Sequence, residues 1–431
     1  MTDARTIPVD PASAERLAGQ RLTYRLVDTE SEADTEAFLR ADARGFLDSD
    51  PTSEKVAADR AGLAERRNIG VFEDASPVGA WPIATVNSWV TPLTVPGGEL
   101  EMWAISSVTV AGTHRRRGIA RALLEGELRA AASAGVPIAG LTVSEATIYG
   151  RYGFASAIPV ARVKVDTRRA GWAGPAPAGR LEYVDRETLK AHLSALHEVA
   201  RTQRAGQIAG WEGRWKRVTG LAAGHPSPTA VRGVRYLDAE GAVRGAMAYK
   251  LTEVEGSFRF DLAIEHIAAV TPEALTALWH FALHHDLVDT VTADQRPVDD
   301  PITWLVADQR GVEFLVHDHG WLRILDVPAA LGGRTYRAPI DAVLRVDDAL
   351  GHAAGSWRLT VGGDGRPAVV AVEGEAADVT LDVVALSALY LGGSSAVRLL
   401  GAGRLHATAE AAASLDDAFR AADAPLLGFW Y

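Results

Sequence analysis

The spacing of hydrophobic residues along the first third of the chain predicts strands, then a helix, then another strand. Residues 21–28, 68–74, 81–95 and 104–110 predict strands, and a helical pattern covers 34–47 after the first of them. Residues 119–134 place apolar side chains at helical spacing, and the apolar stretch 137–143 predicts a buried strand. Strand, helix and strand of these lengths predict a βαβ unit, and hence an α/β domain with a mixed sheet.

A second part of the chain, which follows a segment rich in Gly and Pro, repeats this rhythm in outline. Residues 234–251 predict two strands joined by a turn, and 258–270 predict another strand. A helix is expected next, with Thr271 as its cap and Pro272 at its first position. The strand 288–294 follows it. This order indicates a duplicated fold.

A third part begins near residue 320. Its patterns predict strands at 342–349, 356–374 and 377–383, and helices at 383–393 and 406–423. The chain stops at an apolar stretch, 424–431, although frayed ends are usually polar. Residues 1–20 lack the apolar centre of a secretory signal and are interpreted as a polar tail.

Composition narrows the classes of function. A chain of 431 residues is long enough for two to four domains, and it contains no cysteine for disulfides, thiolate catalysis or cysteine-based metal sites. The net charge of −11 argues against nonspecific binding of nucleic acid. It suits the attraction of a cationic substrate, or simply solubility. No apolar run is long enough for a membrane helix, so we expect a cytoplasmic protein without a membrane partner.

The acidic chain nevertheless concentrates positive charge before the helix expected from residue 119. Arg115, Arg116 and Arg117 precede Gly118, at which a ligand could approach the backbone closely. Cationic side chains at the positive end of a helix are unfavourable unless an anion lies between them. The segment therefore predicts either a polyphosphate site on a helix N-terminus or a solvated basic turn.

Two motifs resemble a known family. Residues 115–120 match the pattern [RQ]-x-x-G-x-[GA] of the GNAT superfamily of acyl-CoA-dependent N-acyltransferases. Together with "SEATIYGRYGF" at 144–154, the segment resembles the Eis (enhanced intracellular survival) family of acetyltransferases. "LYLGG" late in the chain and an aromatic C-terminus agree with this. The resemblance spans most of the chain and is strong over 104–155.

The resemblance implies two fused GNAT-type domains followed by an α+β domain similar to sterol carrier proteins. The corresponding expected boundaries are 1–157, 158–318 and 319–431. Only the first domain is expected to bind acetyl-CoA, because "AAVTPEALTALW" at 268–279 has Pro and Glu where Arg and Gly would be needed. The family also implies a homo-oligomer, specifically a hexamer.

Family members bind the coenzyme through the backbone of a strand, a pyrophosphate loop and a downstream turn. The positions that match them here are Val108, Thr109, Val110, Arg115, Arg116, Arg117, Gly118, Ile119, Ala120, Arg121, Ser144 and Glu145. The family's general acid matches Tyr149, whereas Tyr152 is interpreted as aromatic packing. The general base would be the α-carboxylate of Tyr431.

The substrate and the function are less determined. Phe46, Asp48 and Asp50 match the substrate region only loosely, and a surface loop is the favoured interpretation. His280 and His284 share a helix face, but they lack a carboxylate in a zincin arrangement, so no metal is expected. The predicted function is an acetyl-CoA-dependent N-acetyltransferase that acts on aminoglycoside-like polyamines or lysine side chains, at several positions. The alternative is a non-catalytic protein that binds acyl-CoA or lipid.

Overall fold

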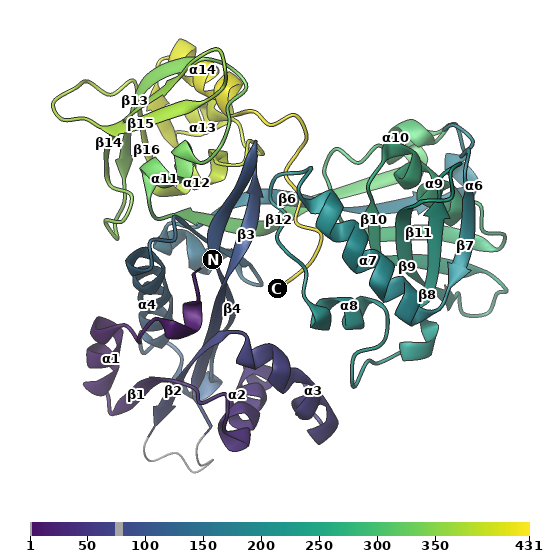
Figure 1. Ribbon diagram of the computed structural model, residues 1–431, viewed down its shortest axis with the longest axis horizontal. Helices are drawn as coiled ribbons and strands as arrows, with labels where there is room; N and C mark the ends of the chain where they lie inside the picture. Colours follow the sequence, from purple (N-terminus) through teal and green to yellow (C-terminus); the bar gives the residue numbers. More distant parts are fainter. Residues whose placement is uncertain (1, 74–80) are drawn as a thin grey trace. The chain divides into compact units, whose positions relative to one another are not determined.

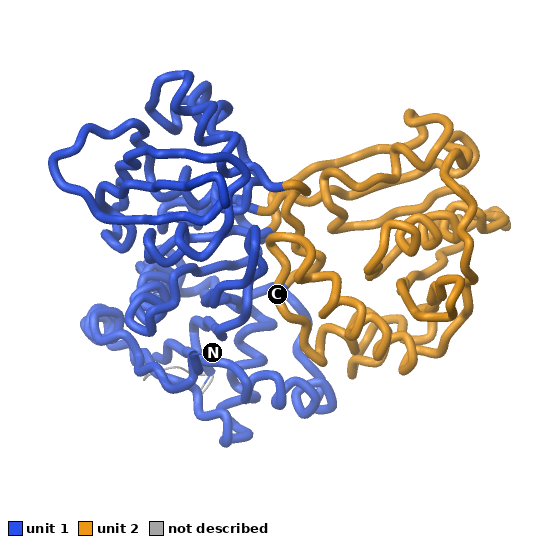
Figure 2. The backbone as a smooth tube through the Cα atoms, turned by 45° about the horizontal axis from the view of Figure 1, so that its top comes forward, with its two compact units in different colours: residues 1–157, 320–421, 431 blue, residues 158–319, 422–430 orange. Residues whose placement is uncertain are grey.

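The computed structural model describes residues 2–73 and 81–431 (Figure 1). Its internal contacts divide the chain into two units (Figure 2). Unit 1 comprises Met1–Ala157, Gly320–Ala421 and Tyr431, and unit 2 comprises Ile158–His319 and Ala422–Trp430. Unit 1 contains the predicted site, and the two units are described separately below.

The first sheet of unit 1 has the strand order β1-β2-β3-β4-β5-β12. Its strands are β1 (Leu22–Leu26), β2 (Arg67–Glu73), β3 (Ala84–Val95), β4 (Gly98–Val110), β5 (Ile138–Thr142) and the end of β12 (Val312–Ile324). The helices beside it are α1 (Pro11–Ala18), α2 (Glu32–Gly45), α3 (Ser53–Ala64), α4 (Ile119–Ser133) and α5 (Ala146–Tyr149). β4 and β5 are parallel, whereas the pairs β1–β2, β2–β3 and β3–β4 are antiparallel. The predicted mixed sheet and βαβ unit are confirmed.

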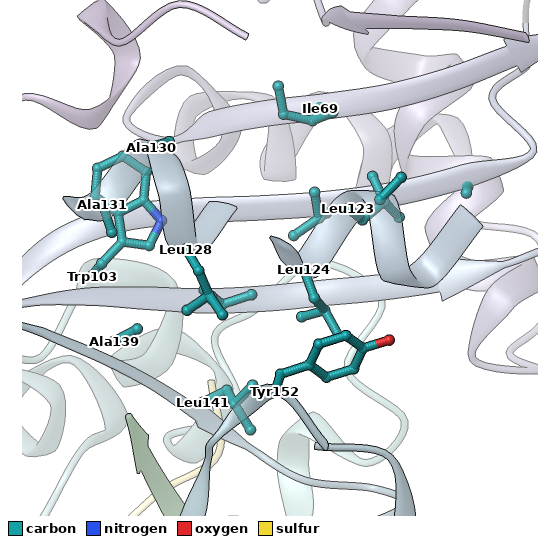
Figure 3. Close-up of a cluster of buried hydrophobic side chains, with 14 of the residues drawn as sticks. Ile69, Trp103, Leu123, Leu124, Leu128, Ala130, Ala131, Ala139, Leu141 and Tyr152 are labelled. Atoms are coloured by element: carbon teal, nitrogen blue, oxygen red, sulfur yellow. The ribbon is translucent and has the colours of Figure 1, made fainter. Parts of the chain in front are cut away.

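The helix α4 covers the sheet with an apolar face that the helical spacing predicted. Leu123, Leu124 and Leu128 are fully buried and belong to one cluster with Trp103 and Leu141 (Figure 3). Burial of side chains of this size stabilises a fold by about 1.5–3 kcal/mol each, so this contact fixes the helix on the sheet.

A buried carboxylate in α4 also fixes the helix. Glu127 and Arg67 of β2 form an ion pair in which both side chains are fully buried, with 3.2 Å between Arg67 Nε and Glu127 Oε1. Trp103 Nε1 donates to Glu127 Oε2 at 3.1 Å, and the Ser88 hydroxyl donates to the same oxygen. One side chain of α4 is thereby bonded to three consecutive strands, β2, β3 and β4.

The segment 1–20 was expected to be a polar tail, but it contains α1, which packs against α4. Its polar residues make this contact. Asp10 caps α1 and accepts hydrogen bonds from Arg129 at 2.7 and 2.9 Å, and the Ser13 hydroxyl donates to the Ala122 carbonyl at 2.7 Å. Residues 1–20 are polar because several of their polar groups hydrogen-bond to α4. Composition alone did not indicate this packing.

The last part of unit 1 has a five-stranded sheet in the order β15-β14-β13-β16-β17. The strands are β13 (Ile340–Asp347), β14 (Gly355–Val361), β15 (Pro367–Ala371), β16 (Val379–Asp382) and β17 (Leu405–Ala407). The helices are α11 (Val327–Gly332), α12 (Val383–Leu389), α13 (Ala396–Gly401) and α14 (Ala409–Phe419). This α+β arrangement agrees with the third domain that the sequence predicted.

Unit 2 repeats the first sheet, with the order β6-β11-β10-β9-β8-β7. Its strands are β6 (Ala155–Asp166), β7 (Arg180–Val184), β8 (Arg232–Leu237), β9 (Val243–Glu253), β10 (Phe260–Ala269) and β11 (Val288–Arg296). Its helices are α6 (Thr167–Ala170), α7 (Arg186–Arg201), α8 (Glu212–Val218), α9 (Pro272–Leu283) and α10 (Ile302–Leu305). β10 and β11 are parallel, as β4 and β5 are, so the predicted duplication is confirmed.

Candidate active site

The strands β4 and β5 separate part of the way along their length. Their paired residues end at Ala104↔Gly140, although β4 continues to Val110. After Ala104, the edge of β4 that faces β5 pairs with no strand among the described residues. Free main-chain groups along a strand edge are suited to an extended ligand, because they can add hydrogen bonds as a further strand would.

The basic loop lies between the end of β4 and α4. Arg115, Arg116 and Arg117 are exposed, and two loop residues have left-handed backbone: Arg116 with φ 62° and Gly118 with φ 78°. Gly118 is the N-cap of α4, and no side chain caps this helix. A Cβ built on Gly118 would meet nothing within 4 Å. The positive end of α4 is therefore open to a ligand.

This geometry fits the diphosphate of acetyl-CoA. The first-turn N–H groups of a helix lack intrahelical partners and attract anions, and no side-chain cap competes for them in α4. Arg115, Arg116 and Arg117 directly precede this helix end in the sequence. Carboxylates pair with two cations of the region: Glu73 Oε1 is 4.0 Å from Arg117 Nη1, and Glu125 Oε1 is 2.6 Å from Arg121 Nε. Glu73 Oε2 is also 3.2 Å from His114 Nε2. Of the two interpretations of the basic loop, the anion site has the better fit.

A β-bulge precedes the segment of β4 that the sequence analysis predicts to bind the coenzyme. The register between β3 and β4 shifts between Thr85↔Thr109 and Asn87↔Ser106, and Ser107 has φ 53°. The bulge leaves an extra residue in β4 outside the ladder, which turns its main-chain groups away from β3. Thr85 stabilises this shape, because its hydroxyl donates to the Ser107 carbonyl at 2.8 Å. Val108 and Val110 are half-buried directly after the bulge.

Tyr149 ends α5 and lies in the core cluster, 7% exposed. Its ring contacts Phe154 edge-on, with 6.3 Å between the ring centroids. Burial, and to a lesser degree Tyr152, raise the pKa of its phenol, so it retains its proton at neutral pH. Tyr152 is buried in the same cluster, as the sequence analysis expected (Figure 3).

Tyr431 lies beside the gap between β4 and β5. The Thr142 hydroxyl donates to the main-chain oxygen of Tyr431 at 2.7 Å, and the Tyr431 ring contacts Trp89 edge-on at 5.4 Å. Gly140 makes room for it: a Cβ there would lie 2.3 Å from Met102 Sδ and 3.1 Å from the Tyr431 hydroxyl. Burial raises the pKa of this phenol.

The residues just before Tyr431 are held within unit 2. Phe429 is fully buried, with ring centroids 5.4 Å from both His197 and Trp211. His319 Nε2 lies 3.0 Å from the Phe429 carbonyl oxygen, and burial lowers the pKa of His319 to about 4. A neutral imidazole can donate this hydrogen bond from Nε2, so the aromatic tail is ordered rather than frayed.

Of the remaining predicted positions, Thr109 and Ile119 are buried and Ala120 is half-buried, whereas the others are exposed: Arg121, Ser144, Glu145, Phe46, Asp48 and Asp50. Glu145 caps α5, accepting from Thr147 N at 3.3 Å and from the Thr147 hydroxyl at 2.6 Å, and Ser144 precedes it at the surface. Phe46, Asp48 and Asp50 follow α2, and Phe46 is 47% exposed. Among the described residues no group of three or more possible metal ligands occurs.

The structure also brings together residues that the sequence analysis missed. Asp42 of α2 lies beside Ser107 of the bulge, and a run of contacts connects Ser107 with Tyr431 through Asn87, Arg66 and Trp89. One signal was available for Asp42. It follows the buried Phe38 by four residues and so occupies the apolar face of α2, where a carboxylate is unusual.

Three parts of the chain match known protein families. Residues 27–157 match a family described as Acetyltransferase (GNAT) domain, and residues 206–324 match a second family with the same description. Residues 327–428 match the family Sterol carrier protein domain. Among helices in the part of the chain that the structure describes, none is both long and apolar enough to cross a membrane.

Individual relatives cover most of the chain. An uncharacterized N-acetyltransferase of Streptomyces avermitilis is 38% identical over 399 residues, which are 90% of this chain and 94% of the relative. N-acetyltransferase Eis of Mycobacterium tuberculosis is 33% identical over 349 residues, which are 78% of this chain and 82% of the relative. The crystal structure of Eis1 from Mycobacterium abscessus matches with a TM-score of 0.80 and 29% identity, covering 95% of this chain and 100% of that chain.

The fold, the open helix N-terminus and these matches define an N-acetyltransferase of the GNAT type, a class whose domains use acetyl-CoA. Of the two functions that the sequence left open, the enzyme is therefore the correct one. Within this class, the chain belongs to the Eis family of N-acetyltransferases.

Proposed function

We propose that this enzyme acetylates primary amines of cationic substrates: aminoglycoside-like polyamines or lysine side chains, with several amines of one molecule accepted. The observation that carries the proposal is the site around β4 and β5, where an uncapped, basic helix end and the main-chain oxygen of Tyr431 both border the gap between the strands. The net charge of −11 supports a cationic substrate.

In this proposal the coenzyme lies along β4. The main-chain groups of Val108, Thr109 and Val110 bind its pantetheine arm and acetyl carbonyl, and the loop Arg115–Arg121 binds its diphosphate. Ser144 and Glu145 border the same region. When bound, acetyl-CoA supplies a thioester whose acetyl group passes to the amine. Holding amine and thioester together in the correct orientation lowers the barrier, since it replaces a bimolecular encounter.

Two groups of the chain move protons. The α-carboxylate of Tyr431 accepts a proton from the amine nitrogen, and the Tyr149 hydroxyl donates one to the departing sulfur. A phenol whose pKa is raised by burial still holds its proton at neutral pH, as a general acid must. The α-carboxylate is an intrinsically weak base, so its contribution comes from its position, which Thr142 helps to fix.

The role of Tyr431 is tested with three variants. Tyr431→Phe keeps the α-carboxylate in place, deletion of Tyr431 moves it by one residue, and a short extension after residue 431 removes it. We expect Tyr431→Phe to retain most of kcat, and the other two to lose about 10²-fold or more while still binding acetyl-CoA. Thiol release and calorimetry measure these quantities. The same extension at the other end of the chain is the control, and an undiminished kcat in the extended enzyme would exclude the carboxylate.

The substrate is tested by an amine panel of aminoglycosides, diamines and lysine peptides, with acetyl groups counted by mass. Turnover with none of the cationic amines would contradict the proposed substrate class. We further propose a cytoplasmic homo-oligomer, a hexamer by family resemblance, without nucleic-acid or membrane partners. Light scattering of the purified protein tests the hexamer.

A further inference from the structure

The Asp42 carboxyl group has an oxygen that the contacts of the described residues do not satisfy. Asp42 lies in the last turn of α2, and its Oδ1 is shielded from solvent without a hydrogen-bond partner among the described residues. Burial of a carboxylate oxygen is unfavourable unless a donor satisfies it. An oxygen of this kind next to an active site is therefore a candidate for binding a donor group of the substrate.

The position of Asp42 is fixed against the coenzyme-binding strand. Three residues further along, Gly45 contacts β4 so closely that a Cβ on it would lie 2.2 Å from Thr109 Cβ. The Ser107 side chain hydrogen-bonds to the Asp42 carboxyl, and Ser107 directly precedes Val108. Asp42 thus borders the segment of β4 that the proposed function assigns to the acetyl group.

A run of side-chain contacts extends from Asp42 to Tyr431. Asn87 Nδ2 donates to Ser107 Oγ at 3.1 Å, and Arg66 Nη1 donates to Asn87 Oδ1 at 3.4 Å. The Arg66 guanidinium lies 3.8 Å from the centroid of the Trp89 ring, which contacts the Tyr431 ring. Asp42 and Tyr431 are therefore two separate carboxyl-bearing residues at the two ends of this run.

The charge state of Asp42 suits an ammonium ligand. Burial raises its pKa to about 6, and Asp48 acts in the same direction. The hydrogen bond from Ser107 and the positive charges of Lys55 and Arg66 oppose this. The carboxyl is thus ionised at neutral pH. Contact with the reacting nitrogen would keep that nitrogen protonated and unreactive, so a second amino group is the better ligand.

From this geometry we infer that Asp42 binds a second, protonated amino group of the substrate, and that it makes the enzyme select diamines and polyamines over monoamines. The inference rests on the proposed function, since it assigns the recognition of the amine to a residue of the same site. Asp42 is a specificity-determining residue here and takes no part in proton transfer.

The test compares 1,4-diaminobutane with butylamine, which differ by one amino group. Wild-type enzyme is expected to have a kcat/KM for the diamine at least about tenfold higher, and Asp42→Asn to lose about tenfold on the diamine while butylamine changes less than about twofold. Glu36→Gln, a carboxylate-to-amide change six residues earlier on the same helix, is the matched control and should change neither; Glu36 is half-buried and pairs with Arg40 at 2.7 Å.

A ratio of the two kcat/KM values that is the same in wild type and Asp42→Asn overturns the inference, while amine acetylation as such would stand. If wild type acetylates no amine, the proposed function fails instead. In that case calorimetry still decides the inference: binding of 1,4-diaminobutane in the presence of coenzyme A must be present in wild type and weakened in Asp42→Asn. Equal binding, or no binding to wild type, overturns it.

Discussion

The strand–helix–strand segments β4-α4-β5 and β10-α9-β11 share one topology but have different helix N-termini. α4 begins after Gly118, which has φ 78°, and no side chain caps it. α9 begins after Thr271, whose hydroxyl accepts a hydrogen bond from Ala274 N at 3.2 Å, and Pro272 has no N–H to offer. Glu273 places a carboxylate in the first turn of α9.

The difference shows that the cap and the first-turn residues are enough to distinguish a helix end that can bind an anion from one that cannot. In α9 one N–H of the first turn is bonded to Thr271, Pro272 has no N–H, and Glu273 supplies negative charge. The positive end of this helix is therefore satisfied within the protein. In α4 these groups are left for a ligand, and exposed arginines add positive charge. This difference gives a local physical reason for the prediction that the second domain does not bind the coenzyme.

The largest expected effect comes from closing the open helix end. Gly118→Val places a β-branched side chain at φ 78° on the face where the diphosphate would lie, so the affinity for acetyl-CoA should fall by about a hundredfold. Gly241→Val is the control, because Gly241 has φ 84° and equally open surroundings in a turn of unit 2. Calorimetric titration measures both. Unchanged affinity for acetyl-CoA in Gly118→Val would contradict the proposal that the open end of α4 binds the diphosphate.

A smaller effect is expected from pH. The pKa of Asp42 is about 6, so about a tenth of this carboxyl remains ionised at pH 5. The preference for 1,4-diaminobutane over butylamine should fall by up to about tenfold between pH 8 and pH 5 in wild type. Because the preference is a ratio of two kcat/KM values, pH effects on groups that act equally on both amines cancel in it. Asp42→Asn should have a pH-independent ratio, and a parallel decline in that variant would contradict the assignment.

The smallest effect is expected at the capped helix. Thr271→Ala removes the cap of α9 and should lower stability by about 1 kcal/mol, because an N–H of the first turn loses its acceptor. Acetyl-CoA affinity should stay unchanged. Thermal unfolding and calorimetry test the two statements, and Thr271→Ser, which keeps the hydroxyl, is the matched control. A change in coenzyme affinity would mean that the second domain takes part in binding.

Sequence patterns predicted the parts of the fold that depend on local spacing. The βαβ unit, the cap at Thr271 and the buried face of α4 follow from residues within one or two helical turns of each other. The contact between Thr142 and Tyr431 joins residues 289 positions apart. Asp42 comes from α2, Ser107 from β4, and Arg66 from the turn between α3 and β2. Such contacts depend on tertiary packing, so no spacing in the sequence contains them.

The buried pair of Glu127 and Arg67 has a consequence for the coenzyme site. Rotation of α4 about its axis would leave an unpaired charge in an apolar core, so the helix has one permitted angular setting. The direction in which the first N–H groups of α4 point therefore depends on Glu127, which lies nine residues after Gly118 on the side of the helix that faces the sheet. Substitution of the loop arginines should leave the orientation of these N–H groups unchanged. Substitution of Glu127 should change their orientation, although Glu127 contacts no ligand.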